Sequence, residues 1–111
     1  MISLNTTSKS LEIVLGGSSV SPLPVVVSTR IIQTSDATTE DTITNTNGTT
    51  AVTIVAAPSA GEKKLVEFIS VYNPNSDNAT VTISVDVSAT KYIILVCTLA
   101  QGERLEYAEG R

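Results

Sequence analysis

The sequence predicts an all-β fold, either an antiparallel β-sandwich or a jelly-roll-like small barrel of seven or eight strands. Short runs rich in Val, Ile and Thr recur at roughly ten-residue spacing, as they do in sandwiches and small barrels. Clusters of Gly, Pro, Asn and Ser separate these runs, and long helical stretches of Ala, Leu, Glu and Lys are absent. A chain of 111 residues suits one domain, so we expect residues 1–111 to form a single β-sandwich domain.

The chain begins with a polar segment, residues 1–10, which we expect to form an N-terminal arm or a short edge strand. Ile2 and Leu4 are its apolar side chains, and they could pack on a neighbouring subunit. The run L-E-I-V-L at residues 11–15 predicts the first regular strand, because a glycine pair directly follows and ends it.

The second predicted strand begins after two prolines, Pro22 and Pro24. Proline cannot donate to a β-ladder, so this strand should start at a sheet edge or in a loop. Val25, Val26 and Val27 then place β-branched side chains on both faces, which indicates cover on both sides. These three valines are therefore candidate contacts with another protein chain.

Residues 33–50 form the longest polar stretch, and we expect them to be a long Thr-rich loop. Ile43 is the single large apolar residue in this stretch, and Asn47-Gly48 is a strong turn signal. An irregular segment of this length is uncommon in a small domain, so a partner could order it. A surface loop without a partner is the alternative. Under the first reading, Ile43 is a candidate contact residue.

Residues 62–87 predict a β-hairpin around the turn N-P-N-S-D-N at residues 73–78. The second strand of this hairpin alternates between apolar and polar residues, so one face should be buried and the other solvated. The side chains expected to point inward are Val81, Ile83, Val85 and Val87. A strand at residues 51–57 precedes the hairpin, and Pro58 follows that strand directly.

The run T-K-Y-I-I-L-V-C-T-L at residues 90–99 predicts a strand that is apolar on both faces. Strict alternation places Tyr92, Ile94 and Val96 on one face. Such a strand is either a central strand covered by the chain itself or part of a subunit interface. A last short strand is expected at residues 103–107.

The composition argues against catalysis. Histidine is absent, which removes the commonest general base and the commonest metal ligand. The eleven carboxylates are spread along the chain and form no convergent pair. The alternating Asn and Asp residues of the 73–78 turn are expected to form the turn rather than bind calcium. We therefore expect no enzyme activity, no metal and no cofactor.

The charge pattern argues against nucleic acid and membranes as partners. The net charge is −4, and Lys63-Lys64 is the largest basic cluster, so phosphate neutralisation is not expected. The start of the chain lacks the pattern of a secretory signal, and no run approaches the ~18 apolar residues of a membrane span. Cys97 is the single cysteine, expected as a small core residue of a protein folded in a reducing cytoplasm.

Three segments together resemble small β-rich structural proteins of tailed bacteriophages. They are T-T-A-V-T-I-V-A-A-P-S-A-G-E-K-K-L-V-E-F-I-S-V-Y-N, then A-T-V-T-I-S-V, then T-L-A-Q-G-E-R-L-E-Y. In those proteins, a strand ending A-A-P-x-A-G leads into a strand ending V-x-N, and an L-A-x-G-E-x-L-x-Y segment follows. The resemblance covers Thr49 to Gly110, a little over half of the chain.

The resemblance implies a non-enzymatic virion component, made in the host bacterial cytoplasm and exposed on the particle. The first expectation is a capsid decoration (cement) or head-fibre-base protein that binds the major capsid protein and copies of itself. A homo-oligomer is expected, with a trimer favoured because local three-fold sites suit decoration. The alternative is a receptor- or glycan-binding module of the tail or baseplate. The resemblance brings no catalytic or cofactor-binding residues with it.

Overall fold

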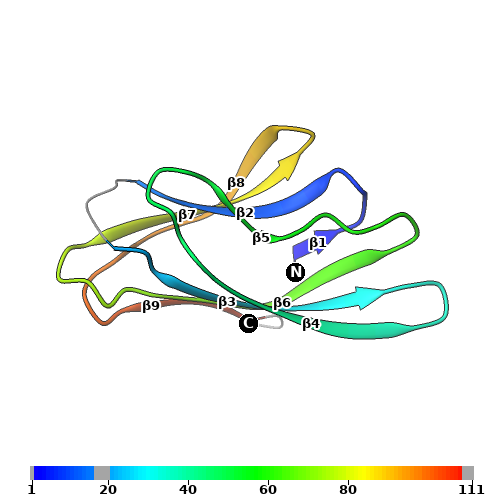
Figure 1. Cartoon of the computed structure of the whole chain (residues 1–111), viewed down its shortest axis with the longest axis horizontal. Helices are drawn as coiled ribbons and strands as arrows, with labels where there is room; N and C mark the ends of the chain where they lie inside the picture. The colour runs from blue at the N-terminus through cyan, green and yellow to red at the C-terminus, as the bar shows by residue number, and fades with distance from the viewer. Residues whose placement is uncertain (1, 17–20, 109–111) are drawn as a thin grey trace.

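The computed structural model describes residues 2–16 and 21–108, which form two antiparallel β-sheets packed face to face (Figure 1). The predicted all-β sandwich is confirmed. The first sheet contains β1 (Ile2–Leu4), β3 (Pro24–Ile32), β4 (Ala37–Asn45), β6 (Lys63–Tyr72) and β9 (Arg104–Ala108). The second sheet contains β2 (Lys9–Leu15), β5 (Val52–Val55), β7 (Ala79–Val87) and β8 (Thr90–Leu99). The described residues thus hold nine strands, where the sequence predicted seven or eight.

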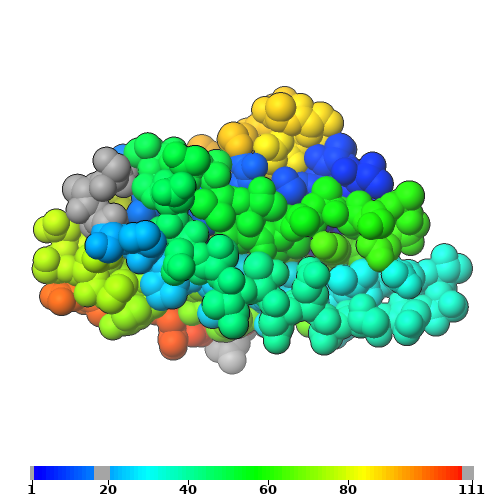
Figure 2. Space-filling view, in the orientation of Figure 1, coloured from blue at the N-terminus to red at the C-terminus, as the bar shows by residue number. Residues whose placement is uncertain are grey.

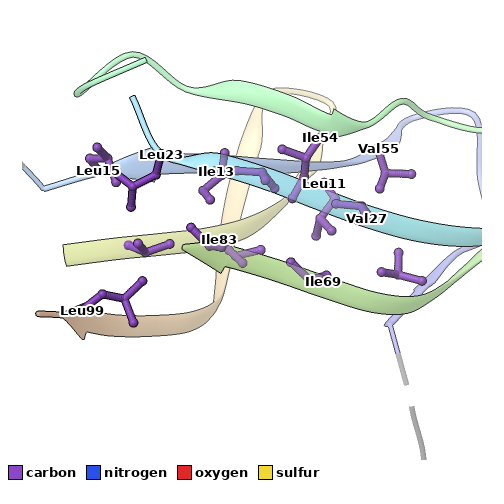
Figure 3. Close-up of a cluster of buried hydrophobic side chains, with 14 of the residues drawn as sticks. Leu11, Ile13, Leu15, Leu23, Val27, Ile54, Val55, Ile69, Ile83 and Leu99 are labelled. Atoms are coloured by element: carbon purple, nitrogen blue, oxygen red, sulfur yellow. The ribbon is translucent and has the colours of Figure 1, made fainter. Parts of the chain in front are cut away.

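The core lies between the two sheets and consists of aliphatic side chains (Figure 3). In β2, every second residue points inward, and Leu11, Ile13 and Leu15 are all buried. Ile69 of β6 and Ile83 of β7 meet them from the first and second sheets. Burying each such side chain contributes about 1.5–3 kcal/mol, so the period-2 pattern of the strands determines which faces pack together.

Strand order leaves long edges at opposite ends of the two sheets. The first sheet has the order β1-β6-β3-β4, and β9 pairs with the second half of the same edge of β6 that β1 occupies. The second sheet has the order β5-β2-β7-β8. The long edge strands are therefore β4 and β8. The predicted N-terminal arm, residues 1–10, contains β1 and the beginning of β2, so half of it belongs to the sheets.

The prediction of a Thr-rich loop over residues 33–50 is wrong for half of its length. β4 occupies Ala37–Asn45 and pairs with β3 along all nine of its residues, from Ile32↔Ala37 to Pro24↔Asn45. The connecting turn is closed by Gln33 N–H, which donates to Asp36 O at 2.9 Å. β4 was not recognisable from hydrophobicity because its side chains are almost all polar. Backbone pairing and the strand preference of threonine form it instead.

The predicted hairpin at residues 62–87 is also wrong, although both of its strands exist. β6 lies in the first sheet and β7 in the second, so the 73–78 turn carries the chain from one sheet to the other. β7 forms its hairpin with β8, in the register from Ala79↔Leu99 to Val87↔Thr90. Alternation predicts which side of a strand is buried, but it does not identify the neighbour across the ladder. The inward direction predicted for Val81 and Ile83 is confirmed, because both are fully buried.

Asn73 explains how the crossing turn is held. Its buried side-chain amide donates to Leu99 O at 2.8 Å and to Asp77 O at 3.0 Å, and its Oδ1 accepts from Asn75 N–H at 3.0 Å. Its backbone N–H donates to Glu103 O at 3.0 Å. The side chain thus binds the β6–β7 turn to the end of β8, and the backbone of Asn73 binds it to the β8–β9 turn. These contacts give the turn asparagines a structural role.

Among the described residues, no helix is long and apolar enough to cross a membrane.

Candidate interaction surface

The structure separates the seven predicted contact residues into buried and exposed groups. Val25 and Val27 are fully buried in the sandwich core, so the prediction that they contact another chain is wrong. Val26 points to the outer face of the first sheet and is half-buried. The four exposed residues are Ile43, Tyr92, Ile94 and Val96. The three adjacent valines alternate between the two faces of β3. The outer one, Val26, is only partly covered by the neighbouring strands.

Ile43 forms a small apolar site on the outer face of the first sheet. It is 77% exposed, and its partner across the ladder is Val26. Polar groups surround this pair, since Val26 is also opposite Ser70 of β6. Near it, Ser28 Oγ donates to Asp41 Oδ1 at 2.9 Å. A single exposed isoleucine in a polar setting is common on protein surfaces.

β8 carries a larger apolar surface, which we call the β8 patch. It consists of Tyr92, Ile93, Ile94 and Val96, which are 57%, 65%, 39% and 61% exposed. Large apolar side chains that are consecutive and exposed on one strand mark interaction sites more often than scattered ones do. The β7–β8 hairpin that bears this patch stands out from the body of the sandwich, in yellow at the top of Figure 2.

β8 is an edge strand, so the alternative of a central strand covered on both sides is wrong. Among the strands of residues 2–16 and 21–108, only β7 pairs with it. Its other side therefore presents backbone N–H and C=O groups to solvent along the strand. Natural edge strands usually carry charges or proline that discourage pairing with another chain. β8 has no proline, and Lys91 is its single charged residue.

A β-bulge changes which side chains of β8 share a face. The register passes from Ile83↔Leu95 to Ser84↔Ile93, which leaves Ile94 as an extra residue. Cross-strand partners point to the same face, and Glu12 of β2 lies opposite Ser84 on the outer face. Ile93 therefore points outward, as Val96 does opposite Thr82. Strict alternation had placed Ile93 and Val96 on opposite faces. No signal in the sequence marks this bulge, so Ile93 was missed.

Lys91 is neutralised within the chain. Its ammonium group donates to Glu12 Oε1 and lies 3.4 Å from Asp86 Oδ2. The hydrogen bond to Glu12 is the main cause that raises the pKa of Lys91 above its ordinary value, and the charges of Glu12 and Asp86 add to it. The β8 patch beyond this cluster is uncharged. Its chemistry suits contact by shape and apolar burial.

The turn at the tip of the hairpin is strained. Ser88 and Ala89 have φ angles of 51° and 73°, a left-handed conformation that is unfavourable for residues with a Cβ atom. Two hydrogen bonds hold it: Ala89 N–H donates to Asp86 Oδ1 at 2.8 Å, and Ser88 N–H donates to Ser8 O at 3.2 Å. Two left-handed residues give the twist that a two-residue hairpin turn needs. Hydrogen bonds to Asp86 and Ser8 thus hold the turn in a conformation that Ser88 and Ala89 themselves disfavour.

Within the described residues, no group of three or more Cys, Asp or Glu side chains is arranged to hold a metal ion. Cys97 is a free, half-buried thiol on the inner side of β8, opposite Val81.

Comparison with protein-family models, with curated proteins and with solved structures found no match to this chain.

Proposed function

We propose that this chain is a non-enzymatic structural protein of a bacteriophage virion. In particular, we propose a capsid decoration or head-fibre-base protein that binds the major capsid protein and copies of itself. One observation carries the proposal: the sandwich exposes four large apolar side chains, on both faces of one projecting edge strand, β8. A surface of this kind suits assembly, because burial of apolar side chains is the main driving force for association.

Two further features support an assembly role. The motif resemblance between Thr49 and Gly110 is to virion structural proteins, and its segments include β5, β6, most of β7 and β9. The exposed acidic residues Glu40 and Asp41 lie on β4, at the far edge of the other sheet, so charge and apolar surface are separated. We propose that the protein forms a homo-oligomer on the particle, with a trimer at local three-fold sites as the favoured arrangement.

Mass spectrometry of purified particles tests the proposal. The protein should be present in mature virions at a copy number comparable with that of the major capsid protein. Absence from mature particles would overturn the virion role, whereas about a dozen copies would place the protein in the neck or tail. A cryo-EM map of the particle then tests the trimeric arrangement, because three-fold density of this size should stand on the capsid surface.

A tail or baseplate module that binds a receptor or glycan is the second candidate. Exposed aromatic side chains favour it, since Tyr72 and Tyr92 are 41% and 57% exposed and sugars stack on aromatic rings. The two tyrosines belong to different sheets, at Tyr72 of β6 and Tyr92 of β8. Saturable binding of the purified protein to host cell envelopes, lost in Tyr92→Ala, would support this candidate over decoration.

A further inference from the structure

We infer that two copies of this chain pair through the free edges of β8, antiparallel and about a two-fold axis, so that their second sheets join. The inference rests on the self-association part of the proposed function and specifies a two-fold dimer for the protein in solution, whereas the proposed trimer concerns the assembled particle. It does not require a virion location. It commits to a second copy as the occupant of the β8 patch.

The register follows from the bulge at Ile94. Residues that face each other across an antiparallel pair must point to the same side of the sheet. Before the bulge, Ile93 points outward; after it, Val96 does, three positions later. Two identical strands can therefore pair with their faces matched when Ile93 of one copy is opposite Val96 of the other. The two-fold axis then passes between Ile94 and Leu95.

This register is self-complementary in chemistry. On the outer face, Ile93 meets Val96, the two most exposed large apolar side chains of β8 at 65% and 61%. On the inner face, Tyr92 lies opposite Cys97, which is half-buried. Toward the ends of the ladder, Lys91 lies opposite Thr98. Because of the two-fold axis, the Ile93–Val96 pair and the Tyr92–Cys97 pair each occur twice in the dimer. The same strand therefore provides both complementary partners of each pair.

Charge favours a second copy at β8 over the other long edge. Each chain has a net charge of −4, so two copies repel each other, and an uncharged contact surface adds no local repulsion to this. On β4, an antiparallel pair centred on the strand would bring Glu40 and Asp41 of two copies close together, although Glu40 lies 3.5 Å from Lys64 of its own chain. On β8, the single charge belongs to Lys91, which Glu12 and Asp86 neutralise within the same chain. Pairing at β8 therefore brings no uncompensated cation or carboxylate of that strand into the contact.

The hairpin leaves room for the partner. It projects from the body of the sandwich in the space-filling view, so the partner strand can approach along it (Figure 2). The C-terminal end of β8 is fastened, because Leu99 O accepts from the Asn73 side chain at 2.8 Å. One end of β8 is therefore held in the core before pairing. The strand then loses less conformational freedom when a second copy binds.

Light scattering after gel filtration gives the first test. The wild-type protein should have twice the 11.6 kDa mass of one chain. Ile93→Lys places a charge in the centre of the contact and should weaken the dimer by about tenfold or more. Ile43→Lys is the matched control, since Ile43 is as exposed but lies on the first sheet, and it should leave the dimer unchanged. Far-UV circular dichroism should show that both variants are folded.

Disulfide formation gives the second test, with Cys97→Ser as the background. An equimolar mixture of the Ile93→Cys and Val96→Cys chains should form a covalent dimer under mild oxidation, because opposite residues have Cβ atoms within disulfide reach. Either chain alone should form at least about tenfold less, since position 93 of one copy is roughly 10 Å along the strand from position 93 of the other. Ile43→Cys should resemble the single chains.

Three results would overturn the inference. They are a monomer at all concentrations with no specific cross-link, a dimer or trimer that Ile93→Lys leaves intact, and cross-linking that is equal in the mixture and in the single chains. None of them bears on whether the protein is present in virions. The two proposals can therefore fail separately.

Discussion

The two long edge strands, β4 and β8, have the same position in their sheets but opposite chemistry. β4 is polar along its length, and its charged residues have partners on the same chain: Glu40 lies 3.5 Å from Lys64, and Asp41 accepts from Ser28. β8 exposes four large apolar side chains and has one charge, Lys91, which is neutralised. Edge strands that carry charges resist pairing with other chains. The difference shows that one edge is protected against association and the other is open to it.

The inner and outer faces of the β7–β8 hairpin should respond very differently to truncation. Ile83→Ala removes a fully buried side chain, and we expect a loss of about 3 kcal/mol in the free energy of unfolding. Ile93→Ala, on the outer face, should change it by less than about 0.5 kcal/mol when the protein is dilute. Urea denaturation of both variants measures the difference. Similar losses in the two variants would contradict the assignment of the faces.

Asn73→Ala should release the fastened end of β8. The substitution leaves the buried Leu99 carbonyl group and the Asp77 carbonyl group in the turn without their donor, and we expect a loss of about 2 kcal/mol. Hydrogen exchange should become faster at the end of β8 and in the β8–β9 turn. Asn78→Ala is the control in the same turn, because Asn78 is exposed, and it should be close to neutral. If both variants behave alike, the buried amide does not hold the strand.

Ala89→Gly should stabilise the projecting hairpin. Ala89 has a φ of 73°, which glycine adopts without a steric penalty, so we expect a gain of about 1 kcal/mol that is reduced by the greater freedom of glycine in the unfolded chain. Ala51→Gly, at an exposed position where φ is not positive, should give no gain. Thermal unfolding of the two variants compares them. A loss of stability in Ala89→Gly would show that the turn is not strained.

The smallest expected effect concerns Lys91 at alkaline pH. Its pKa is raised in the folded chain, chiefly by the hydrogen bond to Glu12. The stabilisation is therefore complete below the ordinary pKa of 10.5 and is lost as the pH rises through the higher folded value. Denaturation from neutral to alkaline pH should show this extra loss in the wild-type protein but not in Lys91→Met. Lys63→Met, at an exposed position, should follow the wild type. The same loss in Lys91→Met would contradict the neutralised edge.

The fold class and the buried face of β7 could be predicted from local patterns in the sequence. Regular strand spacing predicted the sandwich, and the alternation of Val81 and Ile83 predicted which side of β7 is inside. The sequence also indicated that residues 90–99 carry more apolar surface than one buried face requires, which led to Tyr92, Ile94 and Val96. These features depend on the period of single strands, and that period is a local property of the chain.

The identity of neighbouring strands could not be predicted from the sequence, because it depends on contacts between distant segments. The 73–78 turn crosses between sheets, β4 is a strand with almost no apolar residue, and the bulge at Ile94 places Ile93 beside Val96 on the outer face. Each of these depends on backbone hydrogen bonds to residues distant in the sequence. The alternation of apolar and polar residues along a strand does not predict such bonds. Either edge of the strand's backbone can be paired without changing which side chains are buried.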